Sequence, residues 1–201
     1  MRPRGVAPTV LNVPGLVNPA SSGDVASGAT GVMCGDPRLL GRQIARIDGA
    51  GACGVANPVR ITSVSGVQLK NAVRVNCKTA KAFADWTTRT AKPSAEVMGA
   101  VLTQMRPVAS YACRTRNHKK GGRLSEHAKG NAIDIADFTF SNGKTVSVLK
   151  GWRGEGSTYL RRVWKGACGT FGTVLGPESD RYHQDHFHFD TARHFGGPYC
   201  R

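Results

Sequence analysis

The feature that most constrains this 201-residue chain is its set of six cysteines. They are dispersed along the sequence, and none forms a CxxC pair or stands beside clustered histidines. An even, dispersed set without zinc-finger spacing predicts three disulfides in an oxidising compartment; the alternative is six buried free thiols. The sequence does not fix how they pair. We predict the pairs Cys34–Cys53, Cys77–Cys113 and Cys168–Cys200. Each bridge would stabilise the fold by about 3 kcal/mol in the chain-entropy model.

The length predicts one globular domain with a tail, because a chain of this size buries roughly 70% of its unfolded surface. Residues 1–32 are rich in Pro, Gly, Ser, Ala and Val without a period, so we expect a mobile tail or linker. A single domain is expected over residues 33–201. No apolar run approaches the roughly 18 residues of a membrane span, which excludes an integral membrane protein. Prolines interrupt the N-terminal apolar stretch, so we expect that an export signal is missing from this sequence.

The chain carries a formal net charge of +15, and basic residues concentrate between residues 114 and 129. A nucleic-acid-binding surface would interleave aromatic side chains for base stacking, but residues 114–130 contain no Phe, Tyr or Trp. We therefore expect no nucleic-acid partner. An anionic polymer outside the cytoplasm, such as a cell wall or membrane surface, suits both the charge and the cysteines. The alternative is a solvated basic loop.

Periodicity predicts an α+β fold, with a small, mainly antiparallel sheet and helices packed on it. Helical spacing of apolar residues predicts short helices over residues 79–89, 94–105 and 157–164. We expect Ser94 to be the N-cap of the second helix. β-Branched content and alternation predict strands over residues 59–64, 108–113, 132–138, 170–176 and 186–191.

Two segments contain most of the residues suited to catalysis: SEHAKGNAID at 125–134 and HQDHFHFD at 183–190. In the first segment, His127 and Asp134 lie on either side of Gly130. Glycine lets a chain turn tightly, so both side chains can reach one point. We therefore expect these two residues to act together.

In the second segment, strand periodicity puts His186, His188 and Asp190 on one face and Phe187 and Phe189 on the other. The phenylalanines would enter the core while the histidines line a cleft. A catalytic zinc site needs three imidazole or carboxylate ligands and an open fourth position. We therefore favour a metal site. The alternatives are a hydrogen-bonded core histidine and an edge strand with an ordinary polar face.

The first segment reproduces the SxHxxGxAxD motif of the zinc peptidases grouped with lysostaphin, D-Ala-D-Ala metallopeptidases and the hedgehog signalling domain, and the second resembles their HxH motif. More closely, residues 33–201 resemble the bacterial extensin-like C-terminal family. The segments that carry this resemblance are CGDPRLLG, PVRITSVSGVQL, SYACRTRN, ACGTFGTVLGP and PYCR. The resemblance implies the zinc-peptidase core of that group and one Zn²⁺ per chain.

The resemblance also implies roles for the cluster. His127, Asp134 and His188 would be the zinc ligands. His186 would be the non-ligand histidine that polarises or protonates the scissile amide. His183 extends the pattern to HxxHxH, which is similar to that of the penicillin-insensitive murein endopeptidases.

The general base stays open between Asp185 and His186, because the carboxypeptidase branch has glutamate where this chain has Asp185. Arg114 falls where related enzymes hold a substrate carboxylate or an oxyanion, and we expect Ser125 and Arg123 to bind substrate with it. The alternative for Arg114 is a surface cation in a basic loop.

The resemblance implies a zinc peptidase that hydrolyses amide bonds of peptidoglycan stem peptides, and the cysteines suit a periplasmic or secreted protein. HxxHxH and Asp185 favour a cross-link endopeptidase over a D,D- or L,D-carboxypeptidase. The alternative of another class is a zinc-containing, non-catalytic module that binds the cell wall. The sequence does not identify the cross-link that is cut, an activating protein or the oligomeric state.

Overall fold

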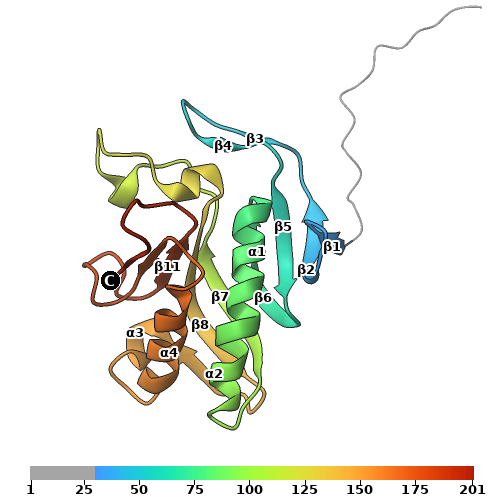
Figure 1. The fold of residues 1–201 in the computed structure, drawn as a ribbon, viewed down its shortest axis with the longest axis vertical. Helices are drawn as coiled ribbons and strands as arrows, with labels where there is room; N and C mark the ends of the chain where they lie inside the picture. Colours follow the sequence, from blue (N-terminus) through green and yellow to red (C-terminus); the bar gives the residue numbers. More distant parts are fainter. Residues whose placement is uncertain (1–29) are drawn as a thin grey trace, which may run out of the picture.

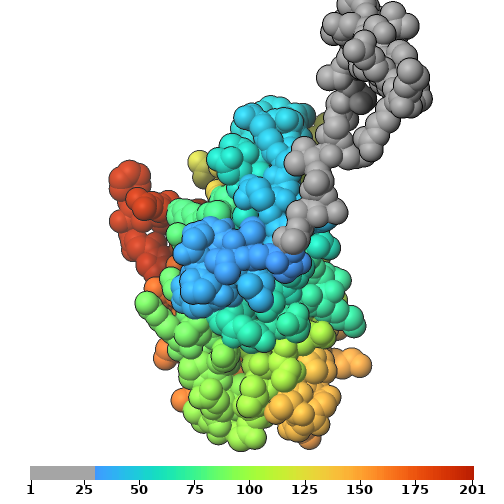
Figure 2. Space-filling model, turned by 90° about the vertical axis from the view of Figure 1, so that its right-hand side faces the viewer, coloured from blue at the N-terminus to red at the C-terminus, as the bar shows by residue number. Residues whose placement is uncertain are grey.

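The computed structural model describes residues 30–201 (Figure 1). The expected tail therefore lies outside the described residues, apart from residues 30–32. Gly31 and Val32 already belong to the first strand. The architecture is mixed α+β and dominated by one large sheet, with few helices and three disulfides. The C-terminal segment, red in Figure 2, projects from one side of the molecule.

The main sheet has ten strands in the order β1-β2-β5-β6-β7-β8-β11-β10-β12, with β9 paired to β8. Its strands are β1 (Gly31–Met33), β2 (Asp36–Gln43), β5 (Val59–Val64), β6 (Val67–Val75), β7 (Leu102–Ala109), β8 (Ala132–Phe140), β9 (Thr145–Ser147), β10 (Thr173–Leu175), β11 (Phe187–Asp190) and β12 (Tyr199–Cys200). A separate hairpin joins β3 (Ile47–Asp48) to β4 (Gly54–Val55). The β6–β7 and β10–β12 pairs are parallel and the others in the sheet are antiparallel, which confirms a mainly antiparallel sheet. The prediction of a small sheet is wrong, because short strands near both ends of the described chain extend it to ten strands.

The helices are α1 (Cys77–Trp86), α2 (Lys92–Glu96), α3 (Val148–Gly151) and α4 (Ser157–Ala167), with the π-helical turn η1 (Thr87–Ala91) and the 3₁₀ turns η2 (Arg116–His118) and η3 (Glu126–Lys129). Helices α1 and α2 run in line along one face of the sheet, joined by η1 (Figure 1). Helix α1 packs on β2 and β5, and α4 packs on α2 and η1. Within residues 30–201, no helix has the length and apolar character needed to cross a membrane.

The strands predicted over residues 59–64 and 132–138 are confirmed as β5 and β8. The strand predicted over residues 108–113 is displaced, because β7 ends at Ala109 and the chain then leaves the sheet. The strands predicted nearer the C-terminus are confirmed in shorter form as β10 and β11.

The helix predicted over residues 94–105 is wrong. Ser94 lies inside α2 instead of capping a helix, and Gly99 (φ +69°) turns the chain into β7. Val97 and Val101, which lie on the apolar side of such a helix, are 64% and 54% exposed. Pairing of β7 with β6 and β8 therefore outweighs the local helical spacing.

All six cysteines form disulfides: Cys34–Cys77, Cys53–Cys113 and Cys168–Cys200. The last pair confirms the prediction, and the other two predicted pairs are wrong. The β1–β2 turn that carries Cys34 lies beside the start of α1, so its neighbour is Cys77. The β3–β4 hairpin carries Cys53 to Cys113, which follows β7. Neither contact is between segments adjacent in the sequence.

An aromatic cluster between the helices and the sheet forms the centre of the core. Trp86, at the end of α1, is fully buried, and its ring centroid lies 5.8 Å from that of Phe83 and 5.1 Å from that of Phe189. Its indole Nε1–H donates to the Val163 carbonyl of α4 at 2.9 Å. Trp86 therefore joins α1, α4 and β11, the strand that carries part of the candidate site.

We predict that Trp86→Ala lowers the free energy of unfolding by about 3–5 kcal/mol, because it leaves a large cavity in the core. Trp86→Phe should cost less, since most of the apolar volume remains. Urea unfolding measures both, with Val97→Ala as the control on an exposed site. A loss below about 1 kcal/mol for Trp86→Ala would contradict this description of the core.

Candidate metal centre

Pairing between β8 and β11 places two of the expected ligands directly opposite each other. His188 pairs with Asp134, while Phe187 pairs with Ile135 and Phe189 with Ile133. Directly opposed residues share one face of a sheet. Both phenylalanines are fully buried in the core, which confirms the alternation predicted from the sequence. The histidine and the aspartate therefore project from the opposite face.

The third expected ligand, His127, comes from the 3₁₀ turn η3. Ser125 caps this turn, because its hydroxyl accepts from the His127 backbone N–H at 3.4 Å. Gly130 ends the turn in the left-handed region (φ +66°). A Cβ at this position would lie 2.8 Å from a methyl group of Val55, so only glycine fits without strain. The glycine of the sequence motif therefore has a clear structural reason.

The three side chains converge on one point. The His127 Nε2 lies 3.1 Å from the Asp134 Oδ1 and 3.2 Å from the His188 Nδ1. The His188 Nδ1 lies 2.8 Å from the Asp134 Oδ1. All three residues are buried, and one ligand atom from each lies within 4.8 Å of those of the other two. This set of atoms could hold one metal ion.

The remaining nitrogen of each imidazole is also held in place. His127 Nδ1–H donates to the Ser110 carbonyl at 2.6 Å, and His188 Nε2–H donates to Asp190 Oδ2 at 3.1 Å. Histidine ligands of metals are usually fixed in this way by a carbonyl or a carboxylate. When both imidazoles are neutral, protons at those positions leave the lone pairs of His127 Nε2 and His188 Nδ1 facing the Asp134 carboxylate. The donor atoms are of the kinds that zinc takes as ligands, imidazole nitrogen and carboxylate oxygen.

Charge in the cluster supports the same interpretation. Burial raises the pKa of the Asp134 carboxyl, but hydrogen bonds from His127 and His188 outweigh it and hold this pKa well below its usual range. Burial lowers the pKa of His188, but hydrogen bonds to Asp134 and Asp190 outweigh it and raise the pKa to about 9. Without a metal, the His188 imidazole therefore carries the positive charge that faces Asp134 at neutral pH. A metal ion would have to displace the proton on Nδ1 of this imidazole.

A polar cavity of about 220 Å³ adjoins the cluster. Its lining includes His127 and His188 together with expected residues Arg114, Ser125 and His183. Arg123 is exposed and does not line this cavity. Three further predicted residues, Asp134, Asp185 and His186, are also absent from the lining of this cavity, although Asp134 belongs to the cluster beside it.

The two other expected histidines each contact an aspartate through Nδ1. The His183 Nδ1 lies 2.7 Å from the Asp180 Oδ1, and the His186 Nδ1 lies 2.7 Å from the Asp185 Oδ1. The His186 Nε2 lies 3.7 Å from the Asp134 Oδ2, so this ring faces the cluster. The Asp185 side chain is 67% exposed. Burial lowers the pKa of His183 despite the hydrogen bond to Asp180.

Three residues of the site received no role from the sequence. Asp190 was expected on the same strand face as His188. This spacing of two residues could have predicted the contact between the Asp190 carboxylate and the His188 imidazole. Asp180 and Ser110 stand outside the HxxHxH and SxHxxGxAxD patterns. Their contacts depend on the loop before β11 and on the end of β7, which the sequence patterns do not describe.

The fold and site define a disulfide-linked α+β domain in which a buried His–Asp–His cluster adjoins a polar cavity. Residues 37–201 match the family described as extensin-like protein C-terminus, and the chain belongs to this family. No curated protein and no solved structure matched the chain.

We predict that Asp190→Asn weakens zinc binding by about 10- to 100-fold, because a neutral amide is a poorer acceptor for the His188 Nε2–H. Competition with a fluorescent zinc chelator measures the affinity. Asp48→Asn, which changes an acid that is 75% exposed in the β3–β4 hairpin, is the matched control and should bind zinc normally. Equal affinity for both variants would show that Asp190 does not support a zinc ligand.

Proposed function

We propose that this chain is a zinc-dependent peptidoglycan peptidase that hydrolyses amide bonds of stem peptides. The observation that carries the proposal is the convergence of His127, Asp134 and His188 beside a cavity that also contains Arg114. The sequence motifs around these residues resemble those of the group of lysostaphin, the D-Ala-D-Ala metallopeptidases and hedgehog, whose core this chain is proposed to share. Three disulfides and a net charge of +15 support a periplasmic or secreted protein that meets an anionic cell-envelope polymer.

In this proposal His127, Asp134 and His188 hold one Zn²⁺. A bound Zn²⁺ lowers the pKa of a water ligand toward about 7 and polarises an amide carbonyl. Ser110 and Asp190 keep the two imidazole rings oriented through their hydrogen bonds. Burial of the three ligands keeps bulk water away from their shared polar atoms.

Proton transfer is assigned to the two histidine–aspartate pairs. His186 Nε2 faces the cluster, while Asp185 accepts from the opposite ring nitrogen and orients the ring. We therefore assign the proton-transfer role to His186 and an orienting role to Asp185. His183 lies in the cavity, where burial lowers the pKa of its imidazole, and Asp180 orients it in the same way. A neutral imidazole can accept a proton at its free nitrogen and then deliver that proton, as imidazolium, to a leaving amine.

Arg114 is assigned to substrate binding. Its guanidinium is partly buried, and the residue lines the same cavity as His127. A guanidinium pairs well with a carboxylate or with an oxyanion, because its N–H groups form a planar fork. The stem peptides of peptidoglycan carry such carboxylates, so Arg114 can orient the scissile bond.

The pattern HxxHxH, which begins at His183, and Asp185 in place of the carboxypeptidase glutamate favour an endopeptidase over a carboxypeptidase. A carboxypeptidase remains the second candidate, favoured by Arg114 as a carboxylate-binding residue.

We predict that the zinc-loaded protein converts cross-linked muropeptide dimers to monomers, which mass spectrometry detects and whose masses identify the bond cut. A chelator should abolish the conversion, and so should His127→Ala, because both remove the bound metal. Release of single terminal residues without loss of dimers would instead establish the carboxypeptidase. Intact dimers with folded, zinc-loaded protein would contradict the peptidase proposal.

A matched pair of variants separates an enzyme from a wall-binding module. His186→Ala should lower kcat by about 10²- to 10⁴-fold while zinc content and binding to isolated cell walls are retained, because this histidine is not a ligand. His118→Ala, on an exposed residue of η2, should behave as the parent protein. Unchanged cleavage by His186→Ala would show that the proton-transfer group is wrongly assigned.

A further inference from the structure

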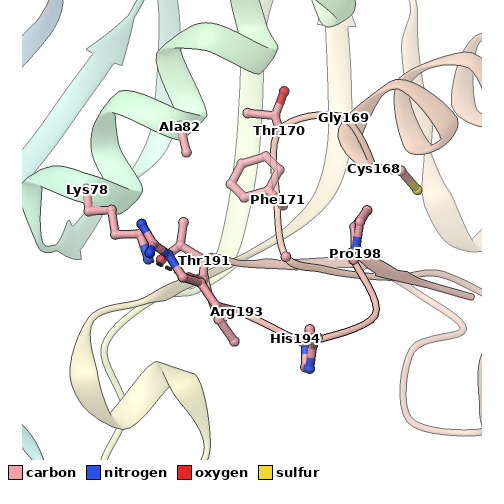
Figure 3. A pocket seen from close by; sticks show the side chains of 13 residues that line it. Lys78, Ala82, Cys168, Gly169, Thr170, Phe171, Thr191, Arg193, His194 and Pro198 are labelled. Carbon is pink, nitrogen blue, oxygen red and sulfur yellow. Dashed lines mark hydrogen bonds between the residues drawn. The ribbon is translucent and has the colours of Figure 1, made fainter.

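A second and larger cavity, of about 620 Å³, lies between α1 and the C-terminal loop at residues 191–198. We call it the C-terminal cavity, and Figure 3 shows its lining. None of its lining residues lines the cavity at the metal centre. The two cavities are therefore separate sites on this domain.

Backbone contacts fix the shape of the C-terminal cavity. Gly172 N–H donates to the Asp190 carbonyl at 2.8 Å, and the Gly172 carbonyl accepts from Tyr199 N–H at 2.8 Å. A Cβ on Gly172 would lie 1.6 Å from the Ala192 carbonyl oxygen, so only glycine allows this close approach. The Cys168–Cys200 disulfide ties the last strand to the end of α4. The walls are thus held by the sheet and a disulfide.

One end of the cavity is strongly basic. Lys78 Nζ donates to the Thr191 carbonyl at 2.7 Å, which uses one of its three hydrogens. Within residues 30–201, no hydrogen bond or ion pair involves the Arg193 side chain, which is exposed. No Asp or Glu lines the cavity. Lys78, Thr191 and Arg193 lie together in Figure 3. Two cations without a facing carboxylate favour an anionic ligand.

The remaining lining adds an apolar surface next to these cations. Ala82 from α1 and Pro198 from the C-terminal loop contribute apolar groups, and Thr170 adds a hydroxyl. Phe171, which is only 2% exposed, lies beneath them as the floor of the cavity. Cavities of this size take small organic ligands, with a few polar groups that set the orientation. An inorganic anion would leave the apolar part unfilled, whereas an organic carboxylate would use both ends.

We propose that the C-terminal cavity is a binding site for an organic carboxylate of about the size of an acylated amino acid. The carboxylate pairs with Arg193 and Lys78, and the apolar body lies against Phe171 and Pro198. This site goes beyond the proposed peptidase activity and needs no metal.

The test is titration of the ¹⁵N-labelled full chain with N-acetylalanine, followed by NMR after treatment with a chelator. Saturable shifts should centre on the amides of Gly172, Thr191 and Arg193. The double variant Lys78→Gln/Arg193→Gln should bind about tenfold or more weakly, because two charge-assisted contacts are lost. Lys150→Gln, on an exposed lysine of α3 outside both cavities, should bind as the parent does.

Two further probes separate the carboxylate from its parts. The methyl ester of N-acetylalanine should bind far more weakly, since it lacks the charge, and inorganic phosphate should bind more weakly, since it lacks the apolar body. Equal binding of either probe would overturn the proposal. The proposal would also be overturned by amide shifts centred on Arg114 or by the absence of saturable binding. Unchanged affinity of a double variant that keeps a native circular dichroism spectrum would overturn it as well. Because no metal or turnover enters this test, its failure is distinguishable from failure of the peptidase proposal.

Discussion

The site depends on one buried charge, the carboxylate of Asp134. A carboxylate in the interior of a protein is costly unless it is paired with positive charge and hydrogen-bonded. Asp134 is 4% exposed, in the middle of a sheet whose neighbouring strands carry mostly apolar side chains. The imidazoles of His127 and His188, which contact this carboxylate, therefore offset the cost of burying it in β8. The same requirement makes the position suited to a cation, whether a proton or a metal ion.

The fold supplies these imidazoles from two distant segments. His188 arrives by strand pairing, which fixes its register against Asp134 through the buried phenylalanines on either side. His127 arrives by a short 3₁₀ turn that needs the Ser125 cap and the left-handed conformation of Gly130. Each route is rigid, so the ligand atoms meet without help from a mobile loop. Function of the proposed kind requires this rigidity, because a metal centre tolerates little displacement of its ligands.

The sequence predicted those parts of the fold that local patterns determine. Alternation identified β8 and the two faces of β11, and it placed His188 and Asp190 on one face. The ligand set with His127 came from the resemblance of the motifs. It failed where distant segments decide the outcome, as at β7, where strand pairing replaces a predicted helix. The same holds for Cys34 and Cys53, whose partners are set by the arrangement of a turn and a hairpin. The contacts of Asp180 and Ser110 in the site were missed for this reason as well.

The central claim is that His127, Asp134 and His188 bind one zinc ion. Anomalous diffraction from crystals of the zinc-loaded protein, recorded on both sides of the zinc absorption edge, tests it most directly. The account predicts one strong peak per chain, bounded by His127 Nε2, His188 Nδ1 and an Asp134 carboxylate oxygen. Zinc bound elsewhere, or no peak at these atoms in zinc-replete crystals, would contradict it.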